Sequence, residues 1–318
     1  MKKLLVLLIF VSLLNSCDDG NMEVKSFDFA DAKAVKCGEG EDFFIYKITG
    51  NEALIISINE SAFDKVSGTT SYVLAEDATL IYRLYDGPVT TETICSAVPA
   101  SNPKVIEEWV STGGDMSVAT NVVKTTDATT GKTTITGFNH TISLTNVTFS
   151  IGDGEQRNDV IPFGVYNVSD TPIATFSTEL QHCTNNDLYV IAGNQVLTLS
   201  LDDATYADLF ANVPTTVGAP RTALINTANT LDIKVFGGTV LGTVICGPSS
   251  AYPTILERWN AKAGIEGNSG IISVETTTNG TGFDHIVTLK NVVLQNPVNQ
   301  LDFTYGSSYI FGTYTSSN

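Results

Sequence analysis

The stretch Gly137-Phe138-Asn139-His140 returns later in the chain as Gly282-Phe283-Asp284-His285. The residues that follow the two stretches also keep the same apolar and asparagine positions. A spacing of about 150 residues indicates duplication of a whole domain rather than a short solenoid repeat. The further matches around these blocks are Thr136 with Thr281, Leu144 with Leu289, Asn146 with Asn291 and Val147 with Val292.

Matches continue in the same order on both sides of this block. They predict two diverged copies of one domain over residues 27–168 and 173–316, with a linker-like join that contains Asp170 and Pro172. We expect each copy to pack its own core. The other matching pairs are Cys37 with Cys183, Gly50 with Gly193, Cys95 with Cys246, Pro103 with Pro253, Glu107 with Glu257, Trp109 with Trp259, Gly164 with Gly312 and Tyr166 with Tyr314.

The residues within each copy favour strands and turns. Runs at 43–48 and 54–58 flank Gly50-Asn51, and runs at 188–191 and 196–201 flank Gly193-Asn194. Apolar runs about a Gly-Asn turn predict β-hairpins. Short strands with frequent turns predict a mainly β fold, an antiparallel β-sandwich or a flattened barrel in each copy.

One short helix is expected in each copy after Pro103 and Pro253, because proline suits the first helical turn. The spacing of Ile106 and Trp109, repeated by Leu256 and Trp259, would form an apolar stripe on that helix.

The N-terminus has the features of an export signal. Lys2 and Lys3 precede an apolar run over 4–14, and a small residue, Ser16, precedes Cys17. This pattern predicts a signal peptide over residues 1–16. The run is shorter than the roughly twenty residues that a membrane-spanning helix needs.

Leu14-Asn15-Ser16-Cys17 resembles the lipobox of bacterial lipoproteins. The resemblance implies cleavage before Cys17, lipidation of its thiol and a tether over 17–26. Asp18-Asp19 resembles the surface-export signal of Bacteroidota lipoproteins. Together they imply an outer-membrane protein that is held by its N-terminal lipid and exposed at the cell surface, with the inner leaflet of the outer membrane as the alternative.

The charge of the chain restricts its partners. The 17 basic and 34 acidic residues give a net charge of −17, which becomes −19 once Lys2 and Lys3 are removed. Such a chain disfavours nucleic acid and anionic lipid surfaces. The partners we expect are therefore the membrane, through the N-terminal lipid, and a protein or glycan that the sequence does not identify.

Four cysteines remain after Cys17, and they fall two in each copy. Pairing of Cys37 with Cys95 and of Cys183 with Cys246 is the one arrangement that makes two equivalent domains. Disulfides persist in exported chains. A metal site and free thiols are the alternatives; a CxxC pair is absent from the sequence, and His182 is the one histidine close to these cysteines. We expect no metal and no cofactor.

Three residue types recur as a candidate binding or acid–base site. They are Glu107, Trp109 and His140 in the first copy, and Glu257, Trp259 and His285 in the second. A carboxylate and a histidine can exchange protons if the fold brings them together. Structural packing of the same residues is the alternative, since a duplicated fold repeats its packing. We assign no catalytic residue, because the sequence contains no HExxH, GxSxG or phosphate-binding loop.

These features favour a non-enzymatic, membrane-anchored binding, adhesion or structural module, although they do not establish whether the chain has an activity. The alternatives are a carbohydrate-active or hydrolytic accessory protein and a periplasmic assembly factor.

Overall fold

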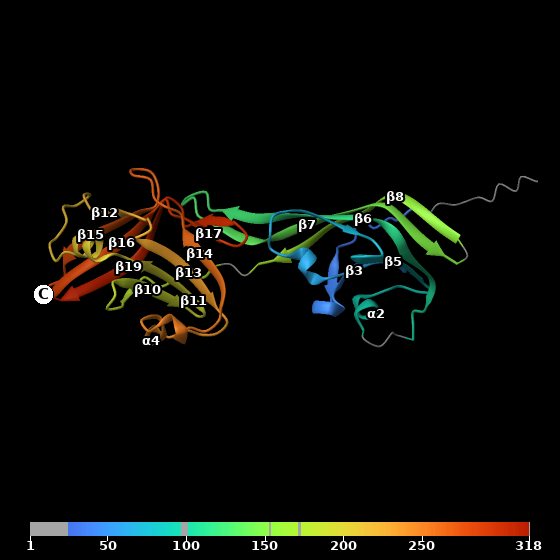
Figure 1. The fold of residues 1–318 in the computed structure, drawn as a ribbon, viewed down its shortest axis with the longest axis horizontal. Coiled ribbons are helices and arrows are strands. Elements are labelled where there is room, and N and C mark those ends of the chain that lie inside the picture. Colours follow the sequence, from blue (N-terminus) through green and yellow to red (C-terminus); the bar gives the residue numbers. More distant parts are fainter. Residues whose placement is uncertain (1–24, 97–100, 153, 171–172, 318) are drawn as a thin grey trace, which may run out of the picture. The chain divides into compact units, whose positions relative to one another are not determined.

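The computed structural model describes residues 25–96, 101–152, 154–170 and 173–317. This part of the chain is mainly β, as predicted, and its strands form three antiparallel sheets that do not close into a barrel (Figure 1). Three short α-helices accompany them in the described residues: α2 (Thr91–Cys95), α3 (Asp203–Leu209) and α4 (Gly242–Ile245). The predicted signal peptide, Cys17 and most of the tether lie outside the described residues.

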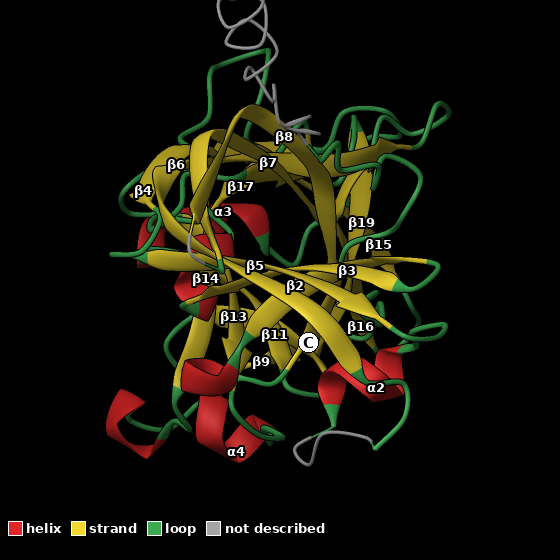
Figure 2. Ribbon diagram, turned by 90° about the vertical axis from the view of Figure 1, so that its right-hand side faces the viewer, coloured by secondary structure: helices red, strands yellow, loops and turns green. Residues whose placement is uncertain are grey.

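The first sheet is formed by residues of the first predicted copy. Its strand order is β1-β2-β3-β5-β6-β7-β8, and β4 pairs with β6. The strands β2, β3 and β5 lie side by side (Figure 2). Three long strands complete the sheet. The strands are β1 (Val35–Cys37), β2 (Phe44–Thr49), β3 (Glu52–Ile58), β4 (Gly68–Val73), β5 (Ala78–Tyr85), β6 (Val105–Thr126), β7 (Thr133–Ile151) and β8 (Gly154–Ser169).

The second predicted copy forms two sheets. One has the order β18-β17-β14-β13-β11-β10-β9 and the other β12-β15-β16-β19. Buried side chains of both sheets meet in one hydrophobic cluster, so the two sheets pack as a sandwich. The strands are β9 (Gln181–His182), β10 (Asp187–Ala192), β11 (Gln195–Ser200), β12 (Arg221–Leu224), β13 (Thr230–Phe236), β14 (Ile255–Ala261), β15 (Ile271–Thr278), β16 (Gly282–Lys290), β17 (Val293–Gln295), β18 (Asp302–Thr304) and β19 (Ser308–Ser317).

The two predicted hairpins are confirmed. The strands β2 and β3 pair from Phe44↔Ser57 to Thr49↔Glu52, and β10 and β11 pair from Asp187↔Ser200 to Ala192↔Gln195. Gly50 and Gly193 have φ values of 60° and 65°, which a residue without Cβ adopts readily. The asparagine after each glycine donates to a backbone carbonyl on the strand next to the hairpin, β5 or β13. Asn51 Nδ2 donates to Tyr85 O at 3.1 Å, and Asn194 Nδ2 donates to Phe236 O at 2.7 Å.

The helices predicted after Pro103 and Pro253 are wrong: these residues form β6 and β14. The burial of β6 alternates from Glu108 onward, with Trp109 and Ser111 buried and Glu108 and Val110 exposed. This period of two, together with pairing against β5, outweighs the three-residue spacing of Ile106 and Trp109. The short helices lie elsewhere. The side chain of Thr90 caps α2 by accepting from the Thr93 amide.

Each predicted copy contains a small buried cluster beside a disulfide. Tyr46 OH lies 3.7 Å from Cys95 Sγ, and Tyr189 OH lies 3.8 Å from Cys246 Sγ. Most members of the two clusters occur in a similar order along the chain. The first contains Cys37, Tyr46, Ala53, Ile55, Tyr85, Val89 and Ile94, and the second contains Cys183, Tyr189, Val196, Phe236, Val240 and Ile245.

Contacts divide the chain into two compact units that differ from the predicted copies. Unit 1 contains the described residues up to Glu60, with Ser71–Ser117 and Ile142–Gly164. Unit 2 contains Ser61–Thr70, Val118–Thr141 and all residues from Val165 onward. The division therefore falls within β6, β7 and β8.

The cores are less separate than the sequence suggests. Ile135 and Phe138, from the first predicted copy, are buried in the main core cluster of unit 2 with Leu188, Trp259 and Phe311. The copy boundaries at 168 and 173 stay a prediction, because contacts between residues do not test a duplication of the sequence.

Candidate functional site

The structure contains both disulfides that the sequence predicts. Cys37 is joined to Cys95 and Cys183 to Cys246, with Cα–Cα distances of 5.5 and 5.3 Å. Cys17, the predicted lipidation site, lies outside the described residues. No group of three or more His, Cys, Asp or Glu side chains in the described part of the chain is placed to hold a metal ion.

The candidate residues Glu107 and Trp109 contact each other in unit 1. Trp109 Nε1 donates to Glu107 Oε1 at 2.8 Å, and the indole packs among Phe27, Tyr82 and Phe149. The indole is 5% exposed, so its ring faces are unavailable for stacking on a ligand. This contact explains the Glu-x-Trp pattern of the first copy as packing.

The candidate histidines have hydroxyl partners and aromatic neighbours. In unit 2, His140 Nδ1 lies 2.9 Å from Thr120 Oγ1, and the ring stacks on Tyr166 and meets the edge of Phe63. His285 Nδ1 likewise lies 2.9 Å from Thr276 Oγ1.

The ring of His285 stacks on Tyr314 and meets the edge of Phe210, so a tyrosine and a phenylalanine surround it as they do His140. His285 Nε2 also lies 2.9 Å from Ser316 Oγ. Neither histidine forms a hydrogen bond with Glu107 or Glu257 in the described residues, so the structure does not assemble the acid–base pair.

Burial lowers the pKa of both histidines, and a nearby Arg221 adds to this effect at His285 while Asp284 opposes it. In the unfolded chain the two histidines bind protons near pH 6.5, whereas in the folded chain they bind them only at a lower pH. The free energy of unfolding is therefore at its full value above pH 6.5 and falls as the pH drops below it. We expect a loss of at most about 1.4 kcal/mol per histidine by pH 5.5.

Urea unfolding between pH 8 and 5 measures this loss. A variant with His140→Asn and His285→Asn should be less stable at pH 8 but show a flatter decline. An equal decline in both proteins would show that other groups control the acid response.

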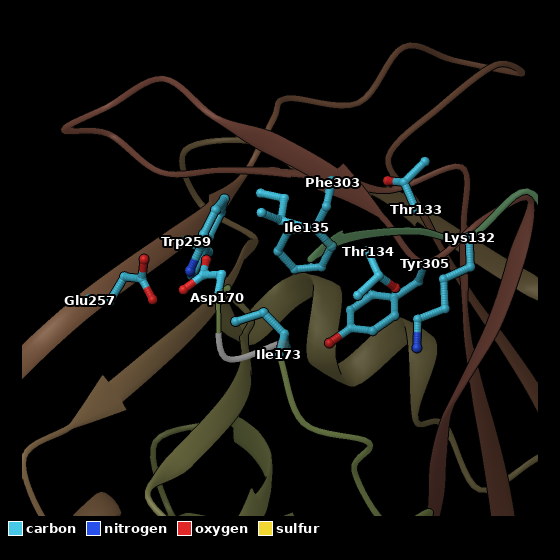
Figure 3. Close-up of a pocket in the computed structure, with 10 residues that line it drawn as sticks. All are labelled: Lys132, Thr133, Thr134, Ile135, Asp170, Ile173, Glu257, Trp259, Phe303 and Tyr305. Carbon is cyan, nitrogen blue, oxygen red and sulfur yellow. The ribbon is translucent and has the colours of Figure 1, made fainter. Parts of the chain in front are cut away.

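Trp259 differs from Trp109, although each follows a glutamate by two residues. Glu257 does not accept from Trp259 Nε1, and this buried nitrogen has no hydrogen-bond partner among the described residues. The indole is 3% exposed and meets Phe303 edge-on at 5.1 Å. Its nitrogen lies at a pocket in unit 2, which Figure 3 shows.

The pocket is built from two parts of the chain within unit 2. Thr304 N donates to Thr133 Oγ1 at 2.8 Å, which ties β18 to β7. The two segments approach each other closely beside the pocket. A Cβ on Gly306 would lie 2.1 Å from Thr130 O, so this position requires glycine. The cavity of the pocket has a volume of about 20 Å³, which is room for about one water. Its walls are Lys132, Thr133, Thr134, Ile135, Asp170, Ile173, Glu257, Trp259, Phe303 and Tyr305.

Tyr305 supplies the second such atom at this pocket, its hydroxyl; the third buried polar atom without a partner in the described residues, His140 Nε2, lies outside the pocket lining. Burial, followed by the effect of Tyr309, raises the pKa of Tyr305 well above its usual value, so the hydroxyl keeps its proton. Native proteins pair nearly all buried polar atoms, and exceptions call for an explanation. Two such donors in one pocket indicate a place where another molecule supplies the acceptors.

Charges lie at opposite sides of the pocket. The carboxylates of Asp170 and Glu257 lie on the Trp259 side, and the Lys132 ammonium lies on the Tyr305 side, 5.7 Å from the ring centroid (Figure 3). Asp170 is held in place by an ion pair with Lys65 and by its amide, which donates to Thr136 O at 3.0 Å.

Sequence reasoning singled out Glu257 and Trp259 but missed Tyr305, Lys132 and Asp170. Their positions in the sequence carry no shared motif: Lys132 directly precedes β7, Tyr305 directly follows β18 and Asp170 directly follows β8, and these strand ends meet at the pocket. The repeated Glu-x-Trp pattern, to which Glu257 and Trp259 belong, was the one feature of the sequence that could have indicated this site.

Comparison of the chain with family models, with curated proteins and with solved structures finds no match. Among the described residues, the helices are all too short or too polar to cross a membrane.

Proposed function

We propose that the protein is a lipid-anchored, surface-exposed lipoprotein that acts as a non-enzymatic binding module, and that the pocket beside Trp259 is its binding site. The observation that carries the binding role is the pair of buried donors, Trp259 Nε1 and Tyr305 OH, at one pocket. The anchor rests on the sequence of residues 1–19.

The first described residues are fixed to the rest of unit 1, which is consistent with a short tether between Cys17 and this unit. Lys25 Nζ lies 2.7 Å from Glu52 Oε1, and Phe27 is buried against Tyr82 and Trp109. Lys25 follows Cys17 by eight residues, which can span at most about 28 Å. An acylated Cys17 would therefore hold unit 1 close to the membrane.

The surroundings of the histidines support a binding role over catalysis. Both rings are fully buried, lie against hydroxyl and aromatic groups, and are held neutral by burial. A general base needs access to the proton that it removes. None of the described residues that line the pocket is a histidine or a cysteine.

Replacement of the predicted lipidated residue tests the anchor. Cys17→Ser removes the thiol, so the chain should move from the membrane fraction to the soluble fraction. Two or more acyl chains hold a protein stably on a membrane, at about 0.8 kcal/mol for each buried CH₂. Fractionation followed by immunoblotting measures the change, and the mass of the N-terminal peptide reports the acyl groups.

Ser16→Ala is the matched control, because it keeps a small residue before an intact thiol and should stay in the membrane fraction. If Cys17→Ser stays membrane-bound to the extent of the wild type, the lipid anchor is refuted.

A further inference from the structure

The geometry points to one hydroxyl group of a neutral ligand, a saccharide, as the occupant of the Trp259–Tyr305 pocket. This inference rests on the proposed binding function and names the chemical class of its ligand.

The two unpartnered donors restrict the chemistry of the ligand. Trp259 Nε1 can only donate a hydrogen bond, so the ligand must offer it an acceptor. A metal ion or an ammonium group offers none. A purely apolar molecule would leave both this nitrogen and the Tyr305 hydroxyl buried without a partner, which is unfavourable.

The charges of the pocket act against anions. Asp170 and Glu257 lie on the side of Trp259, and the whole chain carries a net charge of −17. A carboxylate or phosphate that reached Trp259 Nε1 would meet these like charges. A hydroxyl group accepts from the indole N–H and donates to a carboxylate at the same time, so a neutral polyol satisfies both kinds of group.

The size of the pocket admits one hydroxyl group of a sugar, with the ring outside the cavity. The cavity has the size of about one water, and therefore of one hydroxyl group. Ile135, Ile173 and Phe303 provide apolar walls beside it, against which the C–H groups of a sugar can pack. Lys132, on the far side, can donate to a second hydroxyl.

The two tryptophans make this inference directly measurable. The full chain, labelled with ¹⁵N-tryptophan and purified in detergent, has two indole N–H signals, from Trp109 and Trp259. Trp109 Nε1 already donates to Glu107, so its signal is an internal reference. The probes are D-glucose, D-galactose and D-mannose, compared with acetate, ethylammonium and benzene.

We expect at least one sugar to move the Trp259 signal downfield in a saturable way and to leave the Trp109 signal in place. Tyr305→Phe removes only the hydroxyl and should weaken this binding about fivefold, the effect of one lost neutral hydrogen bond. Tyr309→Phe, which removes a hydroxyl outside the pocket lining, should bind as the wild type does. A dispersed Trp259 signal in each variant shows that unit 2 is folded, and an unchanged Trp109 signal shows the same for unit 1.

The outcomes separate the two proposals. If acetate, ethylammonium or benzene moves the Trp259 signal and no sugar does, the ligand class is wrong and the binding role stands. If none of the probes moves it, the pocket is a buried water site, and both the ligand class and the binding site are refuted. Equal affinity of Tyr305→Phe and the wild type for the sugar would remove Tyr305 from the site.

Discussion

Gly137→Ala should lower the free energy of unfolding by about 3 kcal/mol, at the upper end of the range for overpacking. Gly137 lies in β7, where an added Cβ would be 2.3 Å from Val168 O. The obstacle is backbone, so a rotamer change cannot relieve it. A Cβ added to Gly282, its counterpart in the sequence repeat, would lie 2.0 Å from Ser316 O, and Gly282→Ala should also be destabilising.

Urea unfolding followed by the fluorescence of the buried Trp259 measures both effects, because both glycines lie in unit 2. Gly238→Ala is the matched control: it has an unstrained φ and nothing within 4 Å of the added methyl group, so stability should stay within about 0.5 kcal/mol of the wild type. A Gly137→Ala variant as stable as this control would show that β7 and β8 do not approach as described.

Removal of the second disulfide is expected to have the largest effect of all. Cys183 and Cys246 are 63 residues apart, and closing a loop of this length stabilises a fold by about 4 kcal/mol in the chain-entropy model. Cys183→Ala with Cys246→Ala avoids leaving a buried polar group and should lower the stability of unit 2 by about this amount.

The first disulfide offers a matched comparison. Its cysteines are 58 residues apart, so Cys37→Ala with Cys95→Ala should cause a similar loss in unit 1, which contains Trp109. Fluorescence of Trp109 alone, in a Trp259→Phe background, follows this unit. A stability unchanged by either pair of substitutions would mean that the cysteines do not bridge in the native protein.

Much of the fold follows from local patterns in the sequence. The Gly-Asn turns predicted the β2–β3 and β10–β11 hairpins, because such turns suit only a few backbone conformations. The matched cysteines predicted both bridges for a similar reason: a pairing that serves both copies must occur within each of them.

The errors arose where long-range packing decides the outcome. Ile106 and Trp109 suggested a helix, yet β5 provides a pairing edge and Trp109 enters an aromatic cluster with Phe27. The pocket could not be foreseen either. Lys132 and Tyr305 are far apart in the sequence, and nothing in the pattern of either stretch indicates that they meet.

The predicted duplication bears on the proposed function. Glu107 accepts from Trp109, whereas Glu257 does not accept from Trp259, so the Glu-x-Trp pattern forms a hydrogen bond in the first predicted copy and leaves the buried indole nitrogen of the second without a partner among the described residues. If the proposal is correct, the binding site lies in unit 2 and has walls from both predicted copies.

Protease treatment of intact cells, followed by immunoblotting of the chain, tests most directly whether the chain is exposed at the cell surface, as proposed. We expect the protease to digest the chain while a periplasmic marker protein stays intact. Protection of the chain until the outer membrane is opened would contradict surface exposure and would favour the periplasmic role instead.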